Sequence, residues 1–275
     1  VLTDTALPVS SLNAVNNYTT GVVSANTTNI VTGSAVNLIA AYVANEAGTI
    51  TGLGNETVTV TAPLTVSQLN LLAANTTGVI TAAISDGDMA TLAGITESGN
   101  ALSISVTDIT VSASALNDLN SKTTINLQVN SSTITGSAND LIAVYTAAKT
   151  SGTINGLGGE AVILSDTSIN ASALITLDNL IDGIINASSI TTLTGSDSDQ
   201  EIVRASSGIT GLPAKITPIA FTQIGGDIDG EAFNDSSGDS VSLSADGTVV
   251  AIGARYNDGN YSLTATATDA TGNIS

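Results

Sequence analysis

Apolar residues along the first 200 positions of the chain follow two alternating spacings. One spacing places them at i, i+3 and i+4 behind a Ser, Asn or Asp, as at Ser112, Leu116 and Leu119, and is typical of a capped helix. The other alternates apolar with polar residues, as in TVTVTA (57–62) and ALSISVTD (101–108), and is typical of a strand. A Gly or Asn turn separates the two, so the pattern predicts a repeating unit of short helix, turn, short strand and turn.

Two pairs of matching segments indicate that these units are duplicated. TGSAVNLIAAY (32–42) matches TGSANDLIAVY (135–145) at an offset of 103 residues. GTITGLGNE (48–56) matches GTINGLGGE (152–160) at an offset of 104 residues. Two separate matches at nearly one offset indicate an internal duplication, which is the sequence signature of a repeat protein.

A finer period lies inside the duplication. Four segments each begin with a leucine, carry a second apolar residue three positions later and continue into a turn and an apolar pair; they start at Leu12, Leu69, Leu116 and Leu174. Their spacings are 57, 47 and 58 residues, and helix-like half-units around Leu38, Leu92 and Leu141 lie between them. The repeating unit, called a coil below, is therefore about 25 to 30 residues long.

These coils are expected to stack on one another. A helix of about eight residues is unstable alone, and a single strand has no partner inside its own coil, so neighbouring coils must supply the hydrogen bonds and the apolar cover. We therefore predict a β-rich repeat protein with short helices, folded as an α/β solenoid. The GLG segments at 52–54 and 156–158 are expected to form tight corners that require positive φ or close backbone approach.

The alternative fold is a series of separate β-rich domains of about 50 residues. Such domains would need linkers, but no Pro- or Ser-rich break occurs before about residue 196, and the whole chain contains 4 prolines. This favours uninterrupted stacking.

The pattern changes near residue 200. Where earlier copies continue from TGS into an apolar helix, the copy at 194–196 continues into the acidic residues Asp197, Asp199 and Glu201. The sequence therefore divides into a repeat region at 1–200, a linker at 201–222 and a β-rich module at 223–275 with a β-sandwich or β-blade fold. In that module Asp246-Gly247 indicates the turn of a β-hairpin.

Composition limits the possible functions. The 275 residues include 24 acidic and 5 basic residues, and the formal charge of −19 disfavours binding to nucleic acid or anionic lipid. The chain has no Cys and no His, which excludes thiol nucleophiles, Ser-His triads and the usual zinc and haem ligands. Aromatic residues are 3% of the chain, too few to line the sugar-stacking groove of a glycoside hydrolase. We expect a protein that is not an enzyme.

The acidic segment DIDGEAFND offers the candidate metal site. Asp227, Asp229, Glu231 and Asp235 present carboxylates in a glycine-containing loop, which is the chemistry that calcium prefers. The spacing does not match a full EF-hand, and the calcium-binding nonapeptide motif matches only in part, so a solvated turn is the competing interpretation.

Two further groups of acidic residues have structural interpretations beside a metal-binding one. Asp197, Asp199 and Glu201 are explained by a charged cap on the last coil. Asp86 and Asp88 flank Gly87, and Asp88 is expected to cap the helix that follows it.

The sequence predicts neither a membrane-spanning helix nor a signal segment. The longest apolar candidate, AVNLIAAYVA (35–44), is half the length that a membrane helix needs. The chain opens without Met and without a signal-like segment, which we interpret as a processed or internal piece of a larger protein.

Several segments resemble known repeats of bacterial surface proteins. SVSLSADGTVVAIGA (240–254) is similar to FG-GAP blade units, and YSLTATATDATGNIS (261–275) resembles the last strand of a bacterial immunoglobulin-like repeat. Residues 1 to about 200 resemble repeats of very large, adhesin-like secreted proteins of marine cyanobacteria and related bacteria. The resemblance implies an extracellular or cell-surface location and no defined activity.

Two functions follow as hypotheses. The first is an extracellular structural subunit of a fibre, filament, sheath or stalk, which self-assembles by head-to-tail packing or by addition of an unpaired terminal strand at 1–10 or 261–270. The second is a segment of a giant adhesin that binds a surface, a glycan or ice and is rigidified by calcium. Neither hypothesis involves nucleic acid or membrane insertion.

Overall fold

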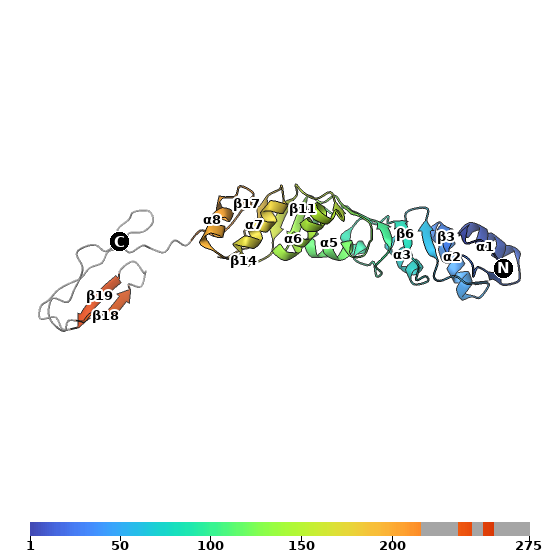
Figure 1. Cartoon of the computed structure of the whole chain (residues 1–275), viewed down its shortest axis with the longest axis horizontal. Helices are drawn as coiled ribbons and strands as arrows, with labels where there is room; N and C mark the ends of the chain where they lie inside the picture. Colours follow the sequence, from blue (N-terminus) through green and yellow to red (C-terminus); the bar gives the residue numbers. More distant parts are fainter. Residues whose placement is uncertain (216–235, 244–249, 256–275) are drawn as a thin grey trace. The chain divides into compact units, whose positions relative to one another are not determined.

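The computed structural model describes residues 1–215, 236–243 and 250–255. Contacts divide the chain into two units, Val1–Pro213 and Ala214–Ser275. The first unit is a mixed α/β structure in which short helices alternate with parallel strands in several sheets (Figure 1).

Short helices follow one another along the first unit in sequence order (Figure 1). They are α1 (Val9–Tyr18), α2 (Ala35–Glu46), α3 (Val66–Ala73), α4 (Met89–Leu92), α5 (Ala113–Asn120), α6 (Ala138–Thr146) with the π-helix η1 (Ala147–Ser151), α7 (Ala171–Leu180) and α8 (Asp197–Ala205).

Most of these helices begin where a polar side chain accepts a hydrogen bond from a backbone N–H of the first turn. The capping residues are Ser34, Thr65, Asp88, Ser112, Ser137, Asn170 and Ser196. The predicted caps at Ser112 and Asp88 are confirmed. Helix α6 begins at Ala138 behind Ser137.

Parallel strands form two larger sheets in the first unit. One sheet has the order β1 (Ala6–Pro8), β3 (Ile30–Gly33), β5 (Thr57–Val60), β6 (Ile80–Ala83) and β7 (Ala101–Ser103). The other has the order β9 (Thr110–Ser112), β11 (Thr133–Gly136), β13 (Ala161–Leu164), β15 (Ile185–Asn186) and β17 (Ile209–Thr210).

Three smaller parallel sheets are formed by the remaining strands of the first unit. They join β2 (Val23–Ser24) with β4 (Ile50–Thr51), β8 (Ser105–Val106) with β10 (Leu127–Val129) and β12 (Ile154–Asn155), and β14 (Ser168–Asn170) with β16 (Thr192–Thr194).

Each parallel pair joins neighbouring coils. The shortest offset between paired residues is 20, at Thr81 and Ala101, and the longest is 28, at Thr133 and Ala161. A parallel pair needs a connection of a dozen or more residues, and here the helix and its turns provide it. Every strand of the first unit therefore depends on the coil before it, the coil after it, or both.

The core of the first unit is mainly aliphatic, as the low aromatic content requires, with Tyr42 and Tyr145 as its buried aromatic residues. One leucine on each of seven helices is fully buried: Leu12, Leu38, Leu69, Leu92, Leu116, Leu141 and Leu174. Burial of one such side chain stabilises the fold by about 1.5 to 3 kcal/mol. The four leucines from which the period was deduced are all in this set.

The asparagine in three of the LN dipeptides links its helix to the next coil. Asn13 Nδ2 donates to the Asn37 carbonyl at 2.9 Å, Asn70 Nδ2 to the Gly94 carbonyl at 2.7 Å, and Asn117 Nδ2 to the Asp140 carbonyl at 3.1 Å. The repeated dipeptide thus combines a buried leucine with a side-chain bond across the coil boundary.

Threonine hydroxyls make a second set of such links. Each donates to a backbone carbonyl of the preceding coil: Thr27 to Leu2, Thr28 to Asp4, Thr77 to Gly54, Thr124 to Asn100, Thr191 to Thr167, Thr194 to Ile169 and Thr210 to Ile185. This accounts for part of the threonine content of the chain.

The end of the first unit differs from the sequence division. Residues 201–213 were assigned to a linker, but α8 continues to Ala205 and β17 pairs with β15. Val203 and Ile209 are buried in this segment. They are too far apart to form a helical or strand spacing, so the sequence did not predict that the segment packs on the core. In the second unit, β18 (Ser236–Leu243) and β19 (Val250–Arg255) form the predicted antiparallel pair, while Asp246-Gly247 lies outside the described residues.

The strand predicted to be unpaired at 1–10 is paired on one side. Ala6–Pro8 forms β1, which pairs with β3, and the Leu2 N–H donates to the Ser24 carbonyl at 2.9 Å. Residues 261–270 lie outside the described residues.

Replacing Asn70 by Ala tests the links between helices. Asn70 also accepts bonds at 3.3 Å from the Thr96 N–H and hydroxyl, so Asn70→Ala should lower the free energy of unfolding by about 1 to 2 kcal/mol. Urea denaturation followed by circular dichroism measures the change. Asn139→Ala on the exposed side of α6 is the matched control and should change stability by less than about 0.5 kcal/mol. Equal effects of the two changes would contradict the link.

Candidate functional site

A buried tyrosine and a glutamate meet at the same place in both copies of the duplication. Tyr42 and Tyr145 end the matching TGS segments, and Glu56 and Glu160 end the matching GLG segments. Each tyrosine comes from a helix, and each glutamate follows a glycine corner that leads into a strand.

The first copy is closed to solvent. The Tyr42 hydroxyl donates to Glu56 Oε1. Glu56 Oε2 accepts from the Gly54 N–H at 2.7 Å and from the Asn55 N–H at 3.0 Å. Glu56 is 1% exposed, so its charge is held by three donors from within the protein.

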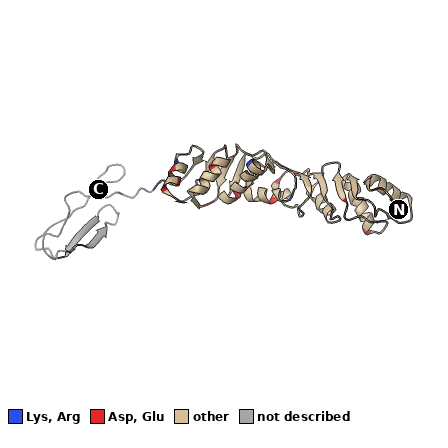
Figure 2. Cartoon of the chain, viewed as in Figure 1, with Lys and Arg blue, Asp and Glu red and all other residues tan. Residues whose placement is uncertain are grey.

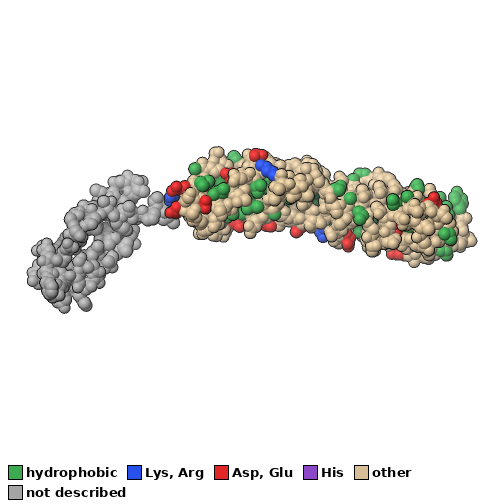
Figure 3. Space-filling view, in the orientation of Figure 1, with side chains coloured by type: hydrophobic (Ala, Val, Ile, Leu, Met, Phe, Trp, Pro, Cys, Tyr) green, Lys and Arg blue, Asp and Glu red, His purple; other side chains and the backbone are tan. Residues whose placement is uncertain are grey.

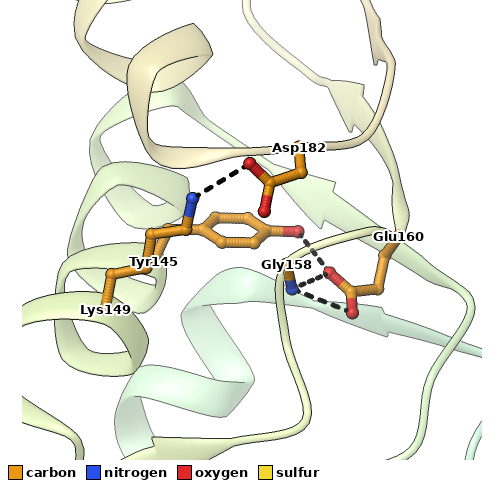
Figure 4. Close-up of polar contacts among 5 residues, drawn as sticks. All are labelled: Tyr145, Lys149, Gly158, Glu160 and Asp182. Carbon is orange, nitrogen blue, oxygen red and sulfur yellow. Dashed lines mark hydrogen bonds and ion pairs between the residues drawn. The ribbon is translucent and has the colours of Figure 1, made fainter.

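The second copy repeats this arrangement with a surface ion pair beside it (Figure 4). The Tyr145 hydroxyl donates to Glu160 Oε2 at 3.2 Å, and the Gly158 N–H lies 3.1 Å from Oε1 and 2.8 Å from Oε2. Lys149 from η1 pairs with Asp182 of the following coil at 3.4 Å. Asp182 is mostly exposed, so this ion pair contributes little stability.

The glycine corner has the backbone conformation that the sequence predicted. Gly52 and Gly156 have φ of 93° and 86°, which L side chains rarely adopt. A Cβ on Gly156 would also lie 2.2 Å from the Val129 carbonyl oxygen of the preceding coil. Positive φ and close approach are therefore both confirmed at this corner.

The next coil packs directly on the glutamate backbone. A Cβ on Gly78 would lie 2.0 Å from the Glu56 carbonyl oxygen, and one on Gly183 would lie 2.1 Å from that of Glu160. The glutamate thus lies between its own corner and the glycine turn of the following coil.

Burial raises the pKa of both tyrosine hydroxyls well above the usual value near 10. At Tyr42 the hydrogen bond to Glu56 and the charge of that carboxylate raise the pKa further. At Tyr145 the charge of Glu160 and the hydrogen bond to it act in the same direction. Both hydroxyls therefore remain donors throughout the physiological pH range.

The chemistry that this arrangement supports is structural. The carboxylate oxygens accept bonds from corner amides and a tyrosine, so the carboxylates hold the corner in its conformation. Sequence reasoning found the corner but missed the pair of side chains, although the repetition of Tyr and Glu at the ends of both matching segments was an available signal.

The candidate calcium ligands Asp227, Asp229, Glu231 and Asp235 lie outside the described residues. Among residues 1–215, 236–243 and 250–255, no group of three or more acidic residues is placed to hold a metal ion. Asp197 and Asp199 lie in the first turn of α8, where the Ser196 hydroxyl accepts from the Asp199 N–H at 3.1 Å, and Glu201 lies one turn after Asp197.

Three aspartates instead cap helices of the preceding coil. Asp86 Oδ2 accepts from the Val66 N–H of α3, Asp108 Oδ2 from the Met89 N–H of α4, and Asp166 Oδ2 from the Ala138 N–H of α6, each at 2.7 Å. Asp88 caps its own helix through the Thr91 N–H at 2.9 Å, and this bond lowers the pKa of its carboxyl. The expectation for Asp88 is confirmed, whereas the cross-coil role of Asp86 was not foreseen.

No protein family model, curated protein or solved structure matches this chain. None of the helices in the described part of the chain is long and apolar enough to cross a membrane.

Replacing Glu160 by Gln tests the role of the carboxylate. The charge that attracts the Gly158 N–H and the Tyr145 hydroxyl is lost, so Glu160→Gln should lower the free energy of unfolding by about 1.5 to 3 kcal/mol. Chemical denaturation measures it. Glu46→Gln, at the exposed end of α2, is the control and should be close to neutral. A neutral Glu160→Gln would show that the corner does not need the charge.

The raised tyrosine pKa values predict a loss of stability at high pH. A hydroxyl whose pKa is higher in the folded than in the unfolded state contributes its full stability below about pH 10 and loses it as the pH rises further. The free energy of unfolding should therefore fall above pH 10 by up to about 1.4 kcal/mol per pH unit for each tyrosine. Tyr42→Phe and Tyr145→Phe should each reduce this slope, and Tyr18→Phe, which alters an exposed residue, should leave it unchanged.

Proposed function

We propose that this chain is a non-enzymatic extracellular structural protein, a repeat subunit of a surface fibre, filament, sheath or stalk. Within this proposal, residues 1–213 form an α/β solenoid in which each coil stacks on the next. The observation that carries the proposal is that polar side chains are used to join successive coils, from Asn13 at one end to Thr210 at the other.

Three kinds of contact support the stacking. Strands pair in parallel with strands 20 to 28 residues away, asparagine and threonine side chains bond across the same boundaries, and aspartates cap helices of the preceding coil. Stability in such a stack is a sum of contributions from neighbouring coils, so length can increase without a larger core. An elongated spacer is the function that this property serves best.

The use of the acidic residues supports a structural role as well. Glu56, Glu160, Asp86, Asp108 and Asp166 accept hydrogen bonds from backbone amides at corners and helix starts. The abundance of acid over base and the absence of Cys and His suit a secreted building material better than a catalyst.

Negative-stain electron microscopy of the full chain tests the proposal. We expect ordered filaments or end-joined rods, imaged with calcium and with chelator. Loss of assembly in chelator would assign a role to the acidic loop at 227–235. Isolated short rods in both conditions would contradict the role as an assembling subunit.

A row of threonines favours a second candidate function, a segment of a surface adhesin. Thr32, Thr59 and Thr81 pair in register across β3, β5 and β6, and none of these strands carries a charged residue. Parallel strands lie about 4.8 Å apart, so methyl and hydroxyl groups repeat at that distance. A regular uncharged row of this kind suits binding to a crystalline surface such as ice.

The adhesin function predicts that a charge in the row abolishes surface binding. Thr59→Lys should remove inhibition of ice recrystallisation, while Thr20→Lys in an exposed turn should leave it intact. The structural function predicts no inhibition by the unmodified chain.

A further inference from the structure

Each helix of the first unit has an outward side, opposite its buried residues. In α3, Leu69 is buried on one side, and at about 100° per residue Ser67, Leu71 and Ala74 lie on the opposite side. All three are exposed. The same outward positions can be compared from helix to helix along the unit.

The outward side of α2 is apolar. It is formed by Val36, Ala40 and Val43, and the two valines are 68% and 57% exposed. Leu71 of α3, which packs against α2, is 49% exposed. These four residues are called the α2–α3 patch, and Figure 3 shows apolar side chains at the surface of the part that contains the two helices. A spacing of three and four residues is the one with which helices pack on each other.

The second copy of the duplication is polar at the same positions. The residues that take the places of Val36, Val43 and Leu71 are Asn139 and Thr146 in α6 and Thr176 in α7. The buried leucine of each of these helices is a leucine in both copies. Stacking of the coils therefore does not require apolar residues on the outward side, and those of the α2–α3 patch need another explanation.

Charge is nearly absent from the part of the unit that carries the patch. Residues 5–85 contain two charged residues, Glu46 and Glu56, and Glu56 is buried. Residues 86–215 contain seventeen, and Figure 2 shows most of the acidic ones along the part that contains α5 to α8. Two chains of charge −19 repel each other, so the α2–α3 patch is where they can approach with the fewest carboxylates in contact.

We propose that the α2–α3 patch binds a second copy of this chain side by side, with the two α2 helices antiparallel about a two-fold axis. Such an axis places the same patch on both copies, and Ala40, in the middle of the outward side, lets the helices approach closely. The exposed Glu46 at the end of α2 then lies near the start of the partner helix, where the helix dipole favours a negative charge. This complementarity favours a second copy over an unrelated protein.

The size of the patch sets the strength of the pairing. The 12 residues of α2 span about 18 Å, and α2 and α3 together are about 20 Å wide, so each copy contributes on the order of 400 Å². Interfaces of this size are weak and transient. We therefore expect a dimer that is populated at high protein concentration. The pairing does not depend on the proposed structural role, because a pair can form without a filament.

Sedimentation equilibrium of the full chain tests the pairing. We expect a concentration-dependent dimer whose dissociation constant rises at least tenfold in Val36→Glu, because each copy would bring a carboxylate into the contact. Asn139→Glu is the matched control, since it adds the same charge at the same exposed position of α6, and it should leave the dimer intact. A chain still monomeric at about 1 mM would overturn the proposal and assign the patch to a different occupant. Equal effects of the two changes, or no effect of Val36→Glu, would also overturn it.

Disulfide cross-linking tests the place of contact. The chain has no cysteine, so Ala40→Cys provides a single thiol that the two-fold axis brings close to its partner. Under a mild oxidant at a concentration where the dimer forms, Ala40→Cys should give a covalent dimer on a non-reducing gel. Ala143→Cys, at the equivalent exposed alanine of α6, should stay monomeric. A dimer that Ala40→Cys does not cross-link, or equal cross-linking of both variants, would contradict pairing through α2.

Discussion

Parallel pairing between coils is the constraint on which the rest of the first unit depends. A strand of two to four residues has no hydrogen-bonding partner strand within its own coil, so its partners are residues 20 to 28 positions away. The helix must be short enough to return the chain within that distance, and the corner after it must turn sharply. The glycine corners and the glutamates that bond to them follow from this requirement, since a corner that relaxed would shift the register of the following strand.

The sequence predicted the parts that depend on local chemistry. Helix starts at Ser112 and Asp88, the corner glycines at 52 and 156 and the periodic leucines were all readable, because each depends on residues a few positions apart. The sequence did not reveal partners across a coil boundary. Asp86 bonds to Val66 and Asp166 bonds to Ala138, 20 and 28 residues away, and this difference in offset depends on a register that no local pattern fixes. The paired tyrosine and glutamate lie in one coil, 14 positions apart at Tyr42 and Glu56, and only their repetition in both copies of the duplication indicated the pair.

Several carboxylates of the first unit have a structural role that the net charge of the chain does not indicate. The sequence predicted a helix cap at Asp88, but the other carboxylates were interpreted as surface charge, as a charged cap on the last coil or as cation ligands. In the described residues several of them accept backbone hydrogen bonds, which places negative charge at helix starts, where the helix dipole favours it. Acidity here is partly a consequence of how many helix starts and corners a repeat architecture contains.

The length of α4 has a mechanical consequence. Its coil has the shortest offset, and its helix is four residues long, so little helix packing supports the boundaries on either side of it. The sheet that begins at β1 ends at β7, just after this coil, and a new sheet begins at β9. If the unit is pulled along its length, the coil boundaries carry the load in series, and the weakest of them yields first. The short coil would then unfold first and extend under tension, while the coils on both sides keep their structure.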